Sequence, residues 1–225
     1  MLQEKDRRKA RNKLATYDPY PKQREFHAAG RDYRERLLMA ANQVGKTWSG
    51  GAEWAIHLTG RYPVWWEGKT FNEPVRFWAA GNTSESTRDT VQRVLVGPPQ
   101  QQEFWGTGMV PGDAIRDWSP SRGTPDALNS IVVKWGGGGD IQAAESVCLF
   151  KSYEQGRQKW QGDTLHGVWN DEEPPSDIYS EGLTRTNATE GIVMTTFTPL
   201  LGMSEVVMSF LTPEQMQTMT SKKAA

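Results

Sequence analysis

The sequence predicts an α/β fold with a mostly parallel central sheet flanked by helices. Three observations lead to this prediction. Short apolar segments that suit buried strands alternate with amphipathic segments of helical length. A glycine-containing loop follows the first of these strands and opens a helix, and an acidic cluster closes a later strand. Strands joined through helices pair in parallel, because a helical crossover returns the chain to the same end of the sheet.

The elements follow from this alternation in chain order. The bend YDPYP (17–21) precedes the first predicted helix, since its two prolines disfavour regular helix. Residues 97–125, rich in Pro and Gly, are expected to form an irregular insertion or lid. We expect helices over 22–33, 46–59, 83–96, 179–186 and 203–211, strands over 37–41, 75–80, 131–135, 146–151, 168–171 and 192–197, and a flexible turn at 136–139.

Composition limits the class of protein. The 225 residues, of which 36% are hydrophobic, suit one large domain. The single cysteine, Cys148, excludes a disulfide framework, and no apolar run is long enough for a membrane span. A net charge of −1 argues against coating nucleic acid by bulk charge. We expect a soluble, intracellular chain with a basic arm (1–16), one domain (17–211) and a polar tail or start of a linker (212–225).

The strongest chemical signal is AANQVGKTW (40–48), which follows a predicted strand and opens a predicted helix. It matches the phosphate-loop pattern G-x-x-x-x-G-K-[ST] except that Ala40 replaces the first glycine. Gly45 permits the tight backbone, Lys46 reaches phosphate oxygens and Thr47 places its hydroxyl on Mg²⁺. Gly-Lys-Thr also occurs by chance, but its position here favours a nucleotide site. The candidate nucleotide contacts are Asn42, Gln43, Val44, Gly45, Lys46, Thr47 and Trp48.

A second signal is GVWNDEEPP (167–175), an apolar strand that ends in three carboxylates and two prolines. In phosphate-loop ATPases the Asp at this strand end, here Asp171, helps to hold Mg²⁺. A following Glu, here Glu172 or Glu173, can orient and deprotonate a water molecule. A solvated acidic turn and a two-metal nuclease site are the alternatives, and the second lacks a convincing set of further carboxylates. The hydroxyls of VMTTFTPL (193–200), at the end of the next predicted strand, form a third and weaker signal, since Thr favours strands in general.

In their order and spacing, these three segments resemble the large terminase subunit of tailed bacteriophages, a DNA-packaging motor. YPKQREFHA (20–28) resembles the adenine-contacting segment of that family, with Tyr20 and Gln23 as candidate contacts. FKSYEQGRQKWQG (150–162) and TFTPLLGMSEVV (196–207) are similar to the stretch before the acidic strand and to the coupling motif. The resemblance covers about residues 17–210.

This resemblance implies a RecA-like P-loop ATPase fold of the additional-strand (ASCE) class that binds ATP and Mg²⁺. It assigns Lys46 and Thr47 to phosphate and metal, Asp171 to the metal, Glu172 to catalysis, and Thr196 and Thr198 to coupling. Members of the family also carry a C-terminal nuclease domain, which we expect to be absent here, so nuclease activity is not carried over.

The resemblance also implies partners. They are double-stranded DNA gripped without sequence preference, a portal protein, a small terminase subunit and a homo-oligomeric ring on the procapsid. The expected location is the host-cell cytoplasm, transiently at the portal vertex, with no membrane. Candidate DNA contacts are the basic residues of 1–13, Lys151, Arg157 and Lys159. Asn42 stands where the family often has a loop Arg, so the candidate arginine fingers are Arg88, Arg157 and Arg185.

Two rival hypotheses remain open at this stage. A helicase-like translocase of another superfamily would need a second RecA-like domain, which we do not expect in this chain. An ATP-binding scaffold without turnover would not need the full set of Lys46, Thr47, Asp171 and Glu172.

Overall fold

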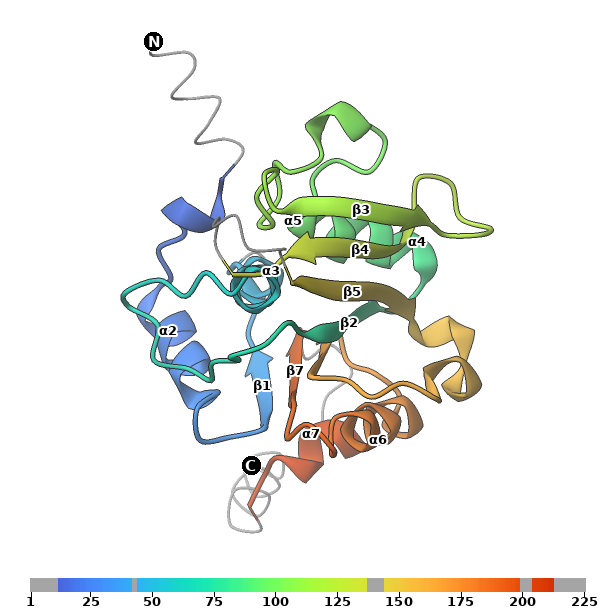
Figure 1. The fold of residues 1–225 in the computed structure, drawn as a ribbon. Coiled ribbons are helices and arrows are strands. Elements are labelled where there is room, and N and C mark those ends of the chain that lie inside the picture. Colours follow the sequence, from blue (N-terminus) through green and yellow to red (C-terminus); the bar gives the residue numbers. More distant parts are fainter. Residues whose placement is uncertain (1–11, 42–43, 137–143, 199–203, 213–225) are drawn as a thin grey trace.

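A single seven-stranded sheet forms the centre of the computed structural model, which describes residues 12–41, 44–136, 144–198 and 204–212 (Figure 1). The strands are β1 (Glu35–Met39), β2 (Arg76–Gly81), β3 (Ile115–Pro120), β4 (Leu128–Lys134), β5 (Glu145–Ser152), β6 (Gly167–Asp171) and β7 (Ile192–Phe197). The α-helices are α2 (Pro21–Ala29), α3 (Lys46–Thr59), α4 (Ser84–Thr87), α5 (Arg93–Leu95), α6 (Ser176–Arg185) and α7 (Glu205–Ser209). A π-helical turn, η2 (Arg88–Gln92), joins α4 to α5, and the 3₁₀ turns are η1 (Leu14–Thr16), η3 (Gln102–Phe104), η4 (Tyr153–Gln155) and η5 (Arg157–Trp160).

The strand order is β1-β7-β6-β2-β5-β4-β3. The five strands from β1 to β5 in this order run parallel, while β4 and β3 are antiparallel at one edge. The predicted mostly parallel sheet is therefore confirmed. The carboxyl ends of β1, β7 and β6 lie side by side. The loops that leave these strands therefore meet at the carboxyl ends of the parallel strands.

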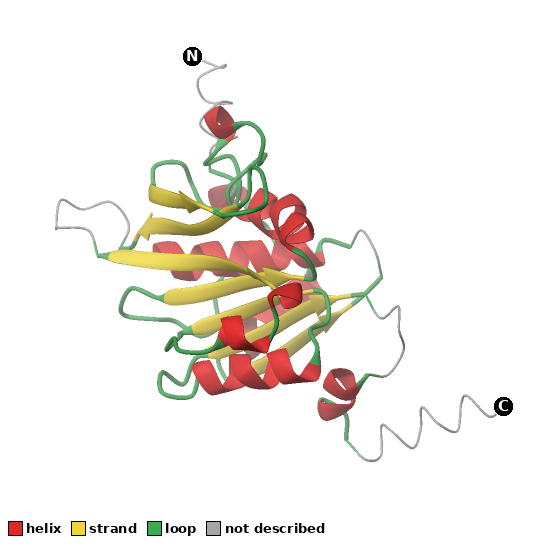
Figure 2. Cartoon of the chain, turned by 90° about the vertical axis from the view of Figure 1, so that its right-hand side faces the viewer, coloured by secondary structure: helices red, strands yellow, loops and turns green. Residues whose placement is uncertain are grey.

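Helices cover both faces of the sheet (Figure 2). Side chains on a strand alternate between faces, and neighbours along the chain accordingly enter different cores. Trp169 packs with Trp54 of α3 in one core, whereas its neighbour Val168 packs with Ile178 of α6 in the other. Helix α3 is buried along almost its whole length, which fixes the helix against the sheet.

The structure differs from the sequence prediction in several places. The expectation that all of 97–125 is irregular is wrong, because Ile115–Pro120 forms strand β3. This half-exposed edge strand lacks an apolar run and is held by pairing with β4. The first strand begins and ends two residues earlier than predicted, and the first helix ends at Ala29. Of the predicted turn at 136–139, only Gly136 lies among the described residues.

Close packing of α3 on β6 yields a stability prediction. A Cβ at Gly50 would lie 2.5 Å from Trp169 Cε2, so Gly50→Ala forces the buried indole to move. We expect this substitution to lower the free energy of unfolding by about 1–2 kcal/mol despite the better helix propensity of Ala. Urea denaturation measures the change.

Gly182→Ala in α6 is the matched control. Its Cβ would lie 3.6 Å from Val168 Cγ1, an ordinary contact, so only the propensity gain of about 0.5–1 kcal/mol should remain. Equal effects of the two substitutions would contradict the packing argument.

Candidate nucleotide-binding site

The site lies where β1, β7 and β6 end, at the entry to α3. Gly45 precedes the helix with φ +80°, a left-handed conformation that disfavours other residues. Lys46 is buried and donates from Nζ to the carbonyl oxygens of Ala40 (2.9 Å) and Ala41 (2.6 Å). The lysine ammonium is thus held over its own loop, at the positive end of a long helix. Asn42 and Gln43 lie outside the described residues.

Three side chains from α3, β6 and β7 form one hydrogen-bonded group, which we call the threonine–aspartate cluster. Asp171 Oδ1 accepts from Thr47 Oγ1 at 2.9 Å and from Thr196 Oγ1 at 2.8 Å. Thr196 Oγ1 in turn accepts from the indole of Trp169 at 2.9 Å. The structure therefore brings together the predicted metal residues Thr47 and Asp171 and the predicted coupling residue Thr196.

Burial raises the pKa of Asp171 to about 6, and its two threonine hydrogen bonds oppose the rise. Desolvation thus outweighs hydrogen bonding at this carboxyl. A buried carboxylate with few compensating charges is an energetic cost in the free protein and a favourable ligand for a cation.

Glu172 departs from strand geometry, and its backbone has φ +72°. Its amide donates to Thr196 O at 2.8 Å, while its carbonyl accepts from the Tyr153 hydroxyl at 2.8 Å. Glu172 Oε2 accepts from the Thr198 amide at 3.4 Å. Left-handed backbone in a non-glycine residue is strained and persists where the surroundings fix it. Burial raises the pKa of the neighbouring Glu173.

A pocket of about 740 Å³ opens beside the loop. Gln23 connects the two sides of this pocket, because its Oε1 accepts from the Tyr20 amide (3.0 Å) and its Nε2 donates to Gly45 O (3.2 Å). The predicted contacts Tyr20, Gln23, Val44, Gly45 and Trp48 thus share one cavity. We call it the loop-side pocket; it is lined by Lys13, Thr16, Tyr17, Asp18, Tyr20, Gln23, Val44, Gly45 and Trp48.

Sequence reasoning missed four residues that line this pocket, namely Lys13, Thr16, Tyr17 and Asp18. Lys13 Nζ lies 5.0 Å from the centre of the Trp48 ring, a cation–π distance, although we assigned Lys13 to a basic arm. Tyr17 also lines the pocket and is half-buried. The YDPYP bend was the signal that could have found Tyr17, since it sets the direction of the tyrosines around it.

The candidate arginine fingers all have partners within this chain. Arg157 Nε and Arg185 Nε lie 3.0 and 3.1 Å from opposite oxygens of the buried Glu181. Arg88 pairs with Asp89 and donates to the Pro125 carbonyl. The structure does not bring these arginines into the threonine–aspartate cluster, and their assignment stays a prediction.

Lys151, a candidate DNA-contacting residue, also has internal contacts. Lys151 Nζ donates to the Lys159 carbonyl at 2.8 Å and lies 4.5 Å from the centre of the Trp78 ring. The Lys159 side chain is exposed. Residues 1–11 lie outside the described part of the chain.

The strand order and the helices on both faces of the sheet define an α/β domain with a mostly parallel sheet, and sequence comparison identifies its family. Residues 37–225 match the family described as terminase large subunit, T4likevirus-type, N-terminal. The chain is 46% identical to the terminase large subunit of Salmonella phage P22, across 94% of this chain and 45% of that protein. It is 27% identical to the terminase large subunit of Enterobacteria phage LP7, across 94% of this chain and 46% of that protein. The chain therefore belongs to the terminase large subunit family, and it spans about half the length of the curated relatives it matches.

Solved structures confirm the fold class. The large terminase of bacteriophage HK97 superposes with a TM-score of 0.55 at 14% identity, over 90% of this chain and 38% of that one. The large terminase of the thermophilic bacteriophage D6E in complex with ADP gives 0.51 at 14% identity, over 80% of this chain and 38% of that one. The predicted RecA-like α/β fold is thus confirmed. Of the helices within 12–41, 44–136, 144–198 and 204–212, none has the length and apolar character to cross a membrane.

The raised pKa of Asp171 predicts how stability depends on pH. The pKa of Asp171 is about 6 in the folded protein, compared with its usual value of 3.8. The folded protein therefore binds a proton at this site more tightly than the unfolded chain does. The stabilisation from this proton is complete below about pH 4 and is lost as the pH rises through about 6, a total of about 3 kcal/mol. Asp171→Asn removes the titration and keeps an oxygen that accepts from both threonines.

We therefore expect Asp171→Asn to be about 2–3 kcal/mol more stable than the wild type at pH 7, in EDTA, and equally stable near pH 4. Urea denaturation across this range measures the difference. A difference that stays constant with pH would show that the Asp171 carboxyl is not the titrating group.

Proposed function

We propose that this chain is the ATP-hydrolysing motor domain of a terminase large subunit and that it powers the movement of double-stranded DNA into a procapsid. The observation that carries the proposal is the threonine–aspartate cluster. It joins the first residues of the phosphate-loop helix to the acidic strand end, with Lys46 held at the same loop. An ADP complex of the D6E large terminase, which shares this fold, supports nucleotide binding here.

The donors of the cluster fit Mg²⁺. The Thr47 hydroxyl and the Asp171 carboxylate are hard oxygen ligands 2.9 Å apart, and Mg²⁺ in nucleotide sites takes one or two protein ligands besides phosphate and water. When bound there, Mg²⁺ would neutralise charge on the β- and γ-phosphate oxygens.

The chain's own residues then account for the remaining steps. The amide of Gly45 and the amino end of α3 face the phosphates, and Lys46 supplies a positive charge. Glu172 orients a water molecule for in-line attack and accepts its proton. The base of ATP occupies the loop-side pocket between Gln23 and Trp48.

Two contacts would couple hydrolysis to movement. Asp171 is bonded to Thr196, and Glu172 is bonded to the Thr198 amide, so both carboxylates are linked to the end of β7. Loss of the γ-phosphate would change the positions of these carboxylates and shift β7. In the assembled motor, a ring of subunits at the portal, loaded with the help of a small terminase subunit, would convert this shift into DNA movement.

ATP turnover with matched carboxylate variants tests the catalytic assignment. We expect Glu172→Gln to lower kcat by about 10²–10⁴-fold while ATP still binds, because it removes the general base and leaves the phosphate contacts. Lys46→Ala should weaken ATP binding itself. Steady-state hydrolysis and equilibrium titration with ATP separate the two effects.

Glu173→Gln is the control, since it neutralises the adjacent carboxylate without touching the proposed base. We expect it to hydrolyse ATP at nearly the wild-type rate. Normal turnover by Glu172→Gln would overturn the assignment, and a wild type that binds ATP without hydrolysing it would favour a scaffold.

Contact with DNA phosphates predicts a salt dependence. The affinity for DNA of unrelated sequences should be equal and should fall linearly with the logarithm of salt concentration. We expect Lys159→Ala to make this slope less steep, by about the amount that one phosphate contact contributes. Lys69→Ala, which removes a lysine next to Glu190 at the amino end of β7, is the control and should leave the slope unchanged. An unchanged slope in Lys159→Ala would exclude Lys159 from the DNA surface.

A further inference from the structure

A buried carboxylate on the phosphate-loop helix connects three elements. Glu53 lies on α3, two turns beyond Lys46, and is almost completely inaccessible. Its Oε1 accepts from Arg36 of β1 at 2.5 Å, and its Oε2 lies 2.7 Å from His27 Nδ1 of α2. His57, one turn further along α3, places Nε2 3.7 Å from Oε1. We call Glu53, His27, Arg36 and His57 the Glu53 cluster.

This carboxylate stays ionised. Burial alone would raise the pKa of Glu53, but the Arg36 guanidinium and the His27 imidazole hold it well below its usual range. A carboxylate accepts hydrogen bonds and cannot donate one, so His27 Nδ1 carries a proton directed at Glu53. His27 Nε2 is then the ring atom that remains for a second hydrogen bond.

His27 Nε2 faces the wall of the loop-side pocket. The Tyr17 hydroxyl lies 3.0 Å from it, and the Ser49 hydroxyl lies 3.2 Å from it. Burial raises the pKa of Tyr17 to about 12, so its hydroxyl keeps a proton to donate. Glu53, His27 and Tyr17 therefore form a continuous chain of hydrogen bonds from α3 to the pocket wall.

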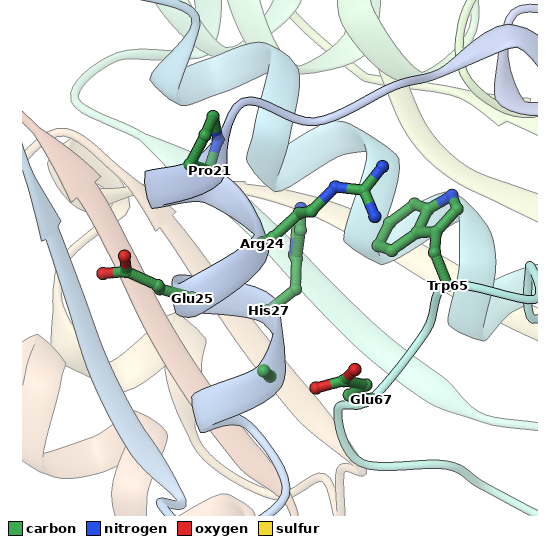
Figure 3. Close-up of a pocket in the computed structure, with 7 residues that line it drawn as sticks. Pro21, Arg24, Glu25, His27, Trp65 and Glu67 are labelled. Atoms are coloured by element: carbon green, nitrogen blue, oxygen red, sulfur yellow. The ribbon is translucent and has the colours of Figure 1, made fainter.

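Aromatic side chains hold the His27 ring in place. The ring centre lies 6.0 Å from that of Tyr17, 5.9 Å from that of Trp65 and 5.4 Å from that of Trp66. Figure 3 shows Arg24, one turn before His27 on α2, reaching toward Trp65, and its guanidinium carbon lies 5.3 Å from the centre of that ring. Helix α2 is thereby fixed to α3 on one side and to the segment of Trp65 on the other.

We propose that His27 is a positioning residue for the nucleotide: held by Glu53, it fixes Tyr17 as a wall of the loop-side pocket. This inference rests on the proposed function, in which that pocket receives the base of ATP. Because Glu53 and Lys46 share α3, the chain of hydrogen bonds sets the base-side wall at a fixed distance from the phosphate loop. Such an arrangement contributes to binding and not to the chemical step.

Variants that remove the link between His27 and Tyr17 test the proposal. Tyr17→Phe deletes the hydroxyl and keeps the ring. His27→Asn keeps a donor toward Glu53 and loses Nε2, the partner of the Tyr17 hydroxyl. We expect each to raise KM for ATP about fivefold, the effect of one lost hydrogen bond, with kcat changed less than about twofold. The double variant should be no worse than His27→Asn alone, because both changes remove the same interaction.

Tyr62→Phe is the matched control. The Tyr62 hydroxyl lies 3.1 Å from Nδ1 of the other histidine in the Glu53 cluster, His57, and Tyr62 is not among the described residues that line the loop-side pocket. It should lose stability, as seen by thermal denaturation, and keep the wild-type KM. Equal rises of KM in Tyr62→Phe and Tyr17→Phe would reduce the cluster to a structural role and overturn the inference.

The outcome for a folded Tyr17→Phe decides the proposal on its own. An unchanged KM for ATP overturns the inference and leaves the proposed function intact, because wild-type turnover persists. Absence of ATP binding by the wild type overturns the proposed function itself.

Discussion

The site depends on one carboxylate oxygen that accepts two hydroxyl hydrogen bonds. Asp171 Oδ1 receives Thr47 from the first turn of α3 and Thr196 from the end of β7. Each of these three residues stands at or next to the end of its element, and the elements meet because β1, β7 and β6 are parallel neighbours. Without that adjacency the phosphate loop and the acidic strand would each remain a local feature. With it, a change of charge or ligand at Asp171 acts on two elements at once.

Packing beneath the site supports this arrangement. The absence of a side chain at Gly50 allows Trp169 to lie against α3, and the Trp169 indole donates to Thr196 Oγ1. The hydroxyl of Thr196 therefore has its acceptor role filled by the indole and its donor role directed at Asp171. A buried aromatic residue of the core thus sets the direction of a buried hydrogen bond at the carboxyl ends of β6 and β7. The contacts of Trp169 therefore serve both the packing of the core and the geometry of the site.

The sequence predicted the parts of the molecule that obey local patterns. Helix 46–59 and strand 192–197 have the predicted bounds, and the spacing of Lys46, Thr47 and Asp171 predicted residues that the fold brings together. Strand β3 could not be predicted, since its half-exposed residues are ordered by pairing with β4 and not by their own pattern. The Glu53 cluster was equally hidden. His57 meets Glu53 through i,i+4 spacing on α3, whereas only the packing of α2 on α3 brings His27 to the same carboxylate.

The backbone at Glu172 explains how two adjacent carboxylates can take different roles. On a regular strand, Glu172 would point to the face opposite Asp171 and into the core beneath α6. Its left-handed conformation breaks the alternation, and the fixed amide and carbonyl contacts to Thr196 and Tyr153 hold it there. The strand therefore ends between the two residues. Asp171 remains buried with the threonines, while Glu172 turns toward the Thr198 amide at the open edge, where a carboxylate can meet water.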